Sequence, residues 1–182
     1  MRKAGVVAAG LLLTVLASCQ GSMLADGEMK LDTHKKGHYP RSYKPVSIDK
    51  AKDALPFKAQ LPEAIPYKYE KPKVVIMDWG EKKKLQLETE YLRKDEKSEK
   101  GFIALKIFNH KNLVSDLIKQ KKYKDTLELE DGTEAYFAYF GNYAELFWLE
   151  DEEEYDLRHM FANEYSEKQL KKELVKIANS MK

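Results

Sequence analysis

Short runs in which apolar and polar residues alternate dominate the second half of the chain. Apolar residues recur at every second position in "LQLETEYL" (85–92), "FIALKIF" (102–108) and "TLELE" (126–130). A period of two puts these residues on one face of a strand, so each run predicts a half-buried β-strand. Four further runs favour strands, at 74–79, 134–140, 144–150 and 155–161. Tight links between runs, such as Asp131-Gly132, predict antiparallel neighbours.

Three other segments have the patterns of helices. "SIDKAKDALPF" (47–57) starts at a good N-cap residue and ends at a proline, while "NLVSDLIKQKK" (112–122) has apolar residues at helical spacing. Near the end of the chain, Ser166 and Gln169 predict a capping box. Five apolar residues then form one helical stripe, namely Leu170, Leu174, Ile177, Ala178 and Met181. Such a stripe predicts an amphipathic helix that covers the sheet.

The segment "LPFKAQLPEAIPYKYEKP" (55–72) contains four prolines. Prolines at this density exclude a helix interior or a central strand, so we expect an extended arm that lies over the domain. The whole pattern predicts an α+β fold, with a curved antiparallel sheet of about six or seven strands and a C-terminal helix packed on it. Residues 47–182 are expected to form this single domain.

The N-terminal residues follow a different pattern. Arg2 and Lys3 precede an uncharged stretch, 4–16, which is shorter than the roughly 20 apolar residues that span a membrane. This arrangement is typical of an export signal, and its end, "LASC" (16–19), resembles a bacterial lipobox. The alternative is an ordinary secretory signal followed by a chance cysteine, but the position of the motif argues against it.

The lipobox resemblance implies a defined processing of the chain. Residues 1–18 would be removed as a signal peptide, and a diacylglycerol group such as one carrying palmitate would anchor Cys19 to the membrane. Cys19 is the single cysteine of the chain, so an intrachain disulfide is excluded. Residues 19–46 contain Gly, Pro and mixed charge without periodicity, which predicts a lipid-anchored flexible spacer.

Removal of the signal also changes the charge balance. The 32 basic residues of the chain include two in the signal, which has no acidic residue, so the rest of the chain has as many basic as acidic residues. A neutral balance gives no reason to expect nucleic acid as a partner. Stable anchoring by two or more acyl chains needs no polybasic patch.

Candidate catalytic and metal-binding residues are sparse. No G-x-S-x-G motif is present. His34 and His38 have the i, i+4 spacing of metal ligands on a helix, but they lie in the predicted spacer. His110 is expected at a strand end, and His159 alternates with apolar residues, so it should face the core. The acidic run 149–156 lacks a calcium-loop pattern and is expected to be a solvated turn. We therefore predict no enzyme, cofactor or metal.

The segment "AYFAYFGNYAELFW" (135–148) contains seven aromatic residues in fourteen positions. Aromatic side chains fall on both faces of the predicted hairpin, so either both faces are covered by other elements or the hairpin forms an apolar cleft. Four residues would line such a ligand cleft: Tyr136, Phe140, Phe147 and Trp148.

The C-terminal part resembles an uncharacterised extracytoplasmic domain of Gram-positive lipoproteins and of membrane proteins with anti-sigma-like cytoplasmic parts. The resemblance rests on Gly132, Trp148, the acidic turn Glu152–Glu154, Ser166 and "KIANSM" (176–181). It extends upstream through "LPFKAQLPEAIPYKY" (55–69), although Pro66-Tyr67 lacks the family's usual glycine, and it covers about residues 53–182. These motifs specify a fold and carry no catalytic residues.

Two functions are consistent with these observations. The first is a non-enzymatic lipoprotein, anchored through Cys19 at the extracytoplasmic face of the cell membrane, that serves as an interaction or sensing module for an envelope protein. The alternative is a carrier that binds a lipid or a lipoprotein in an apolar cleft near the aromatic hairpin. An envelope enzyme is a weaker third option, because it would need His, Asp and Glu side chains that converge in a cleft.

Overall fold

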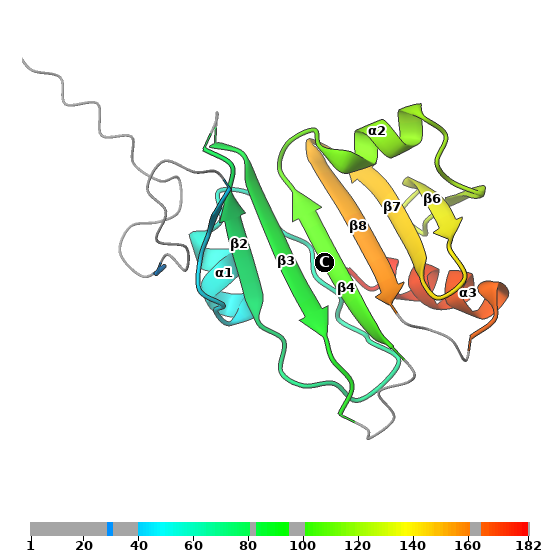
Figure 1. The fold of residues 1–182 in the computed structure, drawn as a ribbon, viewed down its shortest axis with the longest axis horizontal. Helices are drawn as coiled ribbons and strands as arrows, with labels where there is room; N and C mark the ends of the chain where they lie inside the picture. Colours follow the sequence, from blue (N-terminus) through cyan, green and yellow to red (C-terminus); the bar gives the residue numbers. More distant parts are fainter. Residues whose placement is uncertain (1–28, 31–39, 81–82, 95–100, 161–164, 182) are drawn as a thin grey trace, which may run out of the picture.

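The computed structural model describes residues 29–30, 40–80, 83–94, 101–160 and 165–181 (Figure 1). Within these ranges, eight strands form one open antiparallel sheet in the order β1-β2-β3-β4-β8-β7-β6-β5. The strands are β1 (Arg41–Ser42), β2 (Val74–Asp78), β3 (Leu85–Tyr91), β4 (Phe102–Phe108), β5 (Asp125–Glu128), β6 (Glu134–Tyr139), β7 (Ala144–Glu150) and β8 (Glu153–Met160). The helices are α1 (Ile48–Ala54), α2 (Leu113–Lys119) and α3 (Glu167–Ala178).

The sheet consists of two meanders that meet at its centre. Strands β2 to β4 follow one another, as do β5 to β8, and the pairing of β4 with β8 joins the two groups. Leu105 on β4 lies opposite Leu157 on β8 in this central pair, and both are fully buried. The antiparallel α+β fold predicted from the period-two pattern is therefore confirmed.

The expected number of six or seven strands is wrong, because the sheet has eight. The extra strand is β1, which lies inside the segment predicted as spacer and pairs with β2. The next residue, Tyr43, is buried, and its N–H donates to the carbonyl oxygen of Ile76 at 2.9 Å. A strand of two residues is too short to produce a periodic pattern, so no local signal could predict it.

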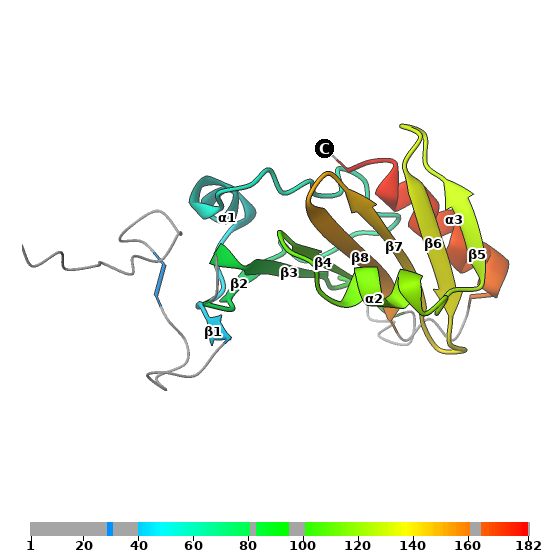
Figure 2. The ribbon, with the colours of Figure 1, turned by 90° about the horizontal axis from the view of Figure 1, so that it is seen from above.

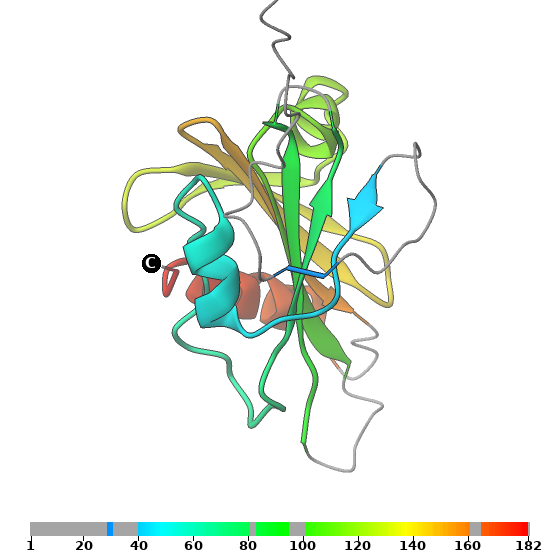
Figure 3. The ribbon, with the colours of Figure 1, turned by 90° about the vertical axis from the view of Figure 1, so that its left-hand side faces the viewer.

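The two faces of the sheet are covered unequally. One face, here called the inner face, packs against α1, the proline-containing segment and α3. The other, the outer face, carries α2, which contacts β7 and β8. Figure 2 shows α1 and α3 on one side of the sheet and α2 on the other, and Figure 3 shows α1 beside the strands when the sheet is seen from its end.

Helix α3 closes the inner face as its apolar stripe predicts. Leu170 and Leu174 are fully buried, and burial of each leucine stabilises the fold by about 2 kcal/mol. The predicted capping box is present, with Ser166 accepting from the N–H of Gln169 and the Gln169 side chain accepting from the N–H of Ser166. No helix in the described ranges is long and apolar enough to span a bilayer.

Candidate functional site

The four aromatic residues of the predicted cleft lie in three different places. Trp148 is on the inner face, is 2% exposed, and stacks on Tyr155 with ring centroids 4.9 Å apart. Phe147 is fully buried on the outer face and stacks with Tyr136 at 5.9 Å. Phe140 follows the end of β6 and is 49% exposed. The structure therefore brings Tyr136 and Phe147 together and separates Trp148 from them.

Packing accounts for the aromatic residues on both faces of this hairpin. On the outer face, Tyr136 and Phe147 pack with Val114 and Leu117 of α2. On the inner face, Trp148 belongs to the core cluster that includes the buried residues of α3. Other elements therefore cover both faces of the hairpin at Phe147 and Trp148, and these two residues do not line an open cleft. Phe140 stacks on Tyr143 at 4.6 Å and remains open to solvent.

The histidines do not form a common site within the described residues. His159 is fully buried on the inner face, as predicted, and its Nδ1 lies 3.1 Å from Oε2 of Glu173. His110 follows β4, and burial lowers the pKa of its imidazole, with Lys84 adding to the effect. His34, His38 and Cys19 lie outside the described residues. No group of three His, Cys, Asp or Glu side chains in the described ranges could hold a metal ion.

The acidic turn between β7 and β8 is only partly solvated. Asp151 and Glu152 are exposed, as expected, but Glu154 is 1% exposed. Its carboxylate accepts from the N–H groups of Val114 and Ser115 at 3.0 and 3.2 Å, and also from the Ser115 hydroxyl. Glu154 therefore holds the first turn of α2 on the sheet, a structural role that the run of acidic residues did not predict.

A network of charged side chains crosses the middle of the outer face. Arg158 on β8 lies between two carboxylates, with its Nη2 2.6 Å from Asp156 and its Nε 3.0 Å from Glu145. Lys106 on β4 lies opposite Asp156, and its ammonium group pairs with the carboxylate of Glu88 on β3 at 3.3 Å. Charges on neighbouring strands thus alternate in sign, which stabilises cross-strand pairs.

Glu145 is the member of this network whose titration is most altered. Burial raises the pKa of its carboxyl to about 7, and the negative charge of Asp156 adds to the effect. Arg158 and Lys106 oppose the shift without cancelling it. The site therefore contains a carboxyl group that changes charge near neutral pH.

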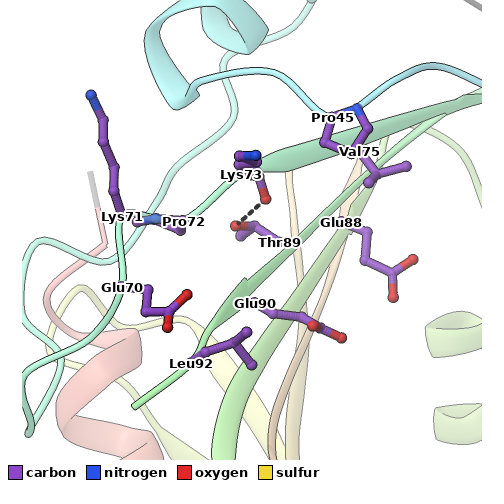
Figure 4. Close-up of a pocket in the computed structure, with 10 residues that line it drawn as sticks. All are labelled: Pro45, Glu70, Lys71, Pro72, Lys73, Val75, Glu88, Thr89, Glu90 and Leu92. Atoms are coloured by element: carbon purple, nitrogen blue, oxygen red, sulfur yellow. Dashed lines mark hydrogen bonds between the residues drawn. The ribbon is translucent and has the colours of Figure 1, made fainter. Parts of the chain in front are cut away.

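A hollow of about 410 Å³ opens at the edge of the same face, over β2 and β3. We call it the β2–β3 groove. Ten residues line it: Pro45, Glu70, Lys71, Pro72, Lys73, Val75, Glu88, Thr89, Glu90 and Leu92. Figure 4 shows the Glu70, Glu88 and Glu90 carboxylates on the same side of the strands as Val75 and Leu92. The groove thus combines negative charge with an apolar floor.

Sequence reasoning placed Glu88 and Glu90 on the solvated face of a strand but did not predict a groove. Its walls come from segments far apart in the chain, with Pro45 before α1 and Glu70 near the end of the proline-containing segment. The N–H of Glu70 donates to the carbonyl oxygen of Leu92 at 2.8 Å, which fixes that wall against the end of β3. A local alternation pattern carries no information about such long-range pairing.

Comparison with known proteins returned no match to a family model, to a curated protein or to a solved structure.

Proposed function

We propose that this protein is a non-enzymatic, lipid-anchored module that binds an envelope protein through the outer face of β2, β3 and β4. The observation that carries the proposal is the unequal cover of the sheet. Three elements pack on the inner face, whereas on the outer face α2 packs over β6, β7 and β8, at the other half of the sheet, among the described residues. The outer face of β2 to β4 is therefore available to a partner in the described part of the structure.

The exposed surface has the mixed character of a recognition site. Leu92 is 41% exposed on this face, and the partly exposed Val75 and Met77 lie on the neighbouring strand. Glu88, Glu90 and Lys106 surround them with charge. Protein interfaces of moderate affinity combine apolar contacts with a charged rim in this way.

The lipid anchor supports the location of the partner. Because the lipobox resemblance assigns a diacylglycerol group to Cys19, the domain would be held at the outer face of the cytoplasmic membrane. There it would meet membrane proteins, other lipoproteins and cell-wall proteins at raised local concentration, so a modest intrinsic affinity would suffice.

The carrier alternative has less support. A lipid carrier needs an apolar cavity, but two of its four predicted cleft residues, Phe147 and Trp148, are packed against other elements. Phe140 is the one strongly exposed member of that set.

Replacement of Cys19 tests the anchor. We expect Cys19→Ala to abolish incorporation of labelled fatty acid and to release the protein from the membrane fraction, because the acyl-accepting sulfur is lost. Ser22→Ala, three residues further along the chain, is the matched control and should remain lipidated. Continued labelling and membrane attachment of Cys19→Ala would show that the anchor proposal is wrong.

Photo-cross-linking in cells tests the binding face. A photoreactive residue at position 90 on the outer face should capture a discrete envelope protein. The same residue at position 172, on the exposed side of α3, serves as the control and should not capture it. Identical adduct patterns at the two positions, or none at position 90, would contradict a role for the outer face.

A further inference from the structure

We propose that the β2–β3 groove binds an extended segment of the partner that carries basic side chains at alternate positions. This inference rests on the proposed function, since it names the chemistry of the partner for the same face. Three features of the groove carry it: the spacing of its carboxylates, its negative charge balance, and its apolar floor.

Two of the carboxylates are spaced for an extended ligand. Glu88 and Glu90 are two residues apart on β3, so both project from the outer face about 7 Å from each other along the strand. Basic side chains at positions i and i+2 of an extended segment have the same spacing and lie on one side of it. On a helix the two side chains would lie about 200° apart, on opposite sides, so the groove favours an extended partner.

The third carboxylate adds charge from the opposite wall. Glu70 faces the groove across from Glu90, and neither carboxylate forms an ion pair with another described residue. Glu88 already pairs with Lys106 at 3.3 Å, and Lys71 points away from the three carboxylates in Figure 4. The lining holds three carboxylates against two lysines, Lys71 and Lys73, so its charge balance is negative, which complements a basic segment.

The apolar floor selects long basic side chains over a bare cation. Leu92, Val75 and the two prolines supply the apolar lining of the hollow. Lysine and arginine bury their aliphatic stems on apolar surface while their charged heads remain at the rim, where the carboxylates lie. An anionic membrane surface would instead be repelled by Glu70 and Glu90, so the groove does not favour lipid headgroups.

A peptide-binding experiment tests the inference directly. The full-length lipidated protein, in an uncharged detergent, is titrated with a fluorescent peptide of sequence Gly-Thr-Lys-Val-Lys-Thr-Gly and with a counterpart in which glutamate replaces both lysines. We expect the lysine peptide alone to bind, with an affinity that falls as salt screens the charges. Glu90→Gln should weaken binding about threefold, and Glu90→Lys about tenfold, as expected for exposed ion pairs.

Charge reversal provides the decisive comparison. Glu90→Lys should also gain binding to the glutamate peptide, which a merely damaged groove would not do. Glu128→Lys makes the same change at an exposed position on β5, at the far edge of the sheet, and should bind like the unaltered protein. Equal affinities for the two peptides, no binding at millimolar concentration, or equal effects of the two reversals would overturn the inference.

The two proposals fail in different ways. Suppose that a partner cross-links to position 90 with equal yield when Glu88 and Glu70 are both replaced by glutamine. In that case the outer face binds a partner of other chemistry, and only the inference about basic segments is lost. If no partner is captured there, the proposed function itself is lost.

Discussion

Glu145 is held in a setting that favours its protonated form. The residue lies on β7 opposite Arg158 and is 5% exposed. Loss of water raises the pKa of its carboxyl from the ordinary 4.5 to about 7, with a further contribution from Asp156. Because the folded protein binds this proton more tightly than the unfolded chain does, the group favours folding in acid.

The titration of the Glu145 carboxyl should be visible in how the unfolding free energy changes with pH. Its contribution is fully present below about pH 4.5, falls as the pH rises to about 7, and is constant above that value. Glu145→Gln should remove this pH-dependent fall in stability. Between pH 4.5 and pH 7, the unfolding free energy of the unaltered protein should therefore fall relative to that of the variant, by at most about 3 kcal/mol. Urea unfolding at a series of pH values measures it.

Glu128→Gln is the control for this prediction, because Glu128 is exposed on the edge strand β5. Its stability profile should run parallel to that of the unaltered protein. A Glu145→Gln profile that is also parallel would show that the buried carboxyl does not titrate in this range.

Helix α2 depends on a side chain from another element. The helix has seven residues, and its N-cap residue, Asn112, makes no side-chain capping bond. Glu154 from β8 supplies the missing acceptor for Val114 and Ser115. A carboxylate at this end also interacts favourably with the helix dipole. A helix so short has little stability of its own, so this contact fixes it on the sheet.

Loss of the Glu154 contact should loosen α2 selectively. Glu154→Ala removes charge-assisted bonds to two N–H groups, so we expect a loss of about 2 kcal/mol in unfolding free energy. Amide hydrogen exchange should accelerate most at residues 113–119. Glu152→Ala, in the same turn but exposed, should leave both measurements unchanged. Uniform acceleration across the sheet would contradict a local role.

The capping box of α3 makes a smaller and separable contribution. Ser166→Ala removes the acceptor for the Gln169 N–H and should lower the unfolding free energy by about 1 kcal/mol. Ser166→Asp should restore most of it, because aspartate is an equally good N-cap. Thermal unfolding of the three proteins measures the difference, and failure of aspartate to rescue would point to a role other than capping.

Elements with a strong local pattern were predicted well, and contacts between distant segments were not. The stripe from Leu170 to Ala178 and the alternation in 85–92 correctly gave α3 and β3. Met181, which was expected on the same helical stripe, lies beyond the end of α3 and forms a β-bridge with Pro62. The same patterns could not show that Glu154 binds α2 or that Glu70 lies against the end of β3, because both contacts join residues more than 20 positions apart. The candidate groove is made of such contacts.

At the scale of the whole molecule, the folded part extends further toward the N-terminus than the composition indicated. Residues 41–46 pair along β2, through β1, Tyr43 and the bridge from Val46 to Val74. The Lys44 N–H also donates to the carbonyl oxygen of Lys30 at 2.8 Å, and Met29 packs against the core. These contacts shorten the segment that was predicted as a spacer, and they place Pro45 at the groove.

This extension predicts a stability difference between two shortened chains. A chain that begins at residue 47 lacks Tyr43, which is 5% exposed, and the backbone bonds to β2, whereas one that begins at residue 40 keeps both. We expect the unfolding free energy of the shorter chain, measured in urea, to be about 3 kcal/mol lower, chiefly because the buried aromatic ring is lost. Tyr43→Ala in the longer chain should reproduce most of that loss. It should also weaken binding of the lysine peptide, because Pro45 would no longer be held at the rim of the groove. Equal stability of the two chains would show that residues 40–46 belong to the spacer after all.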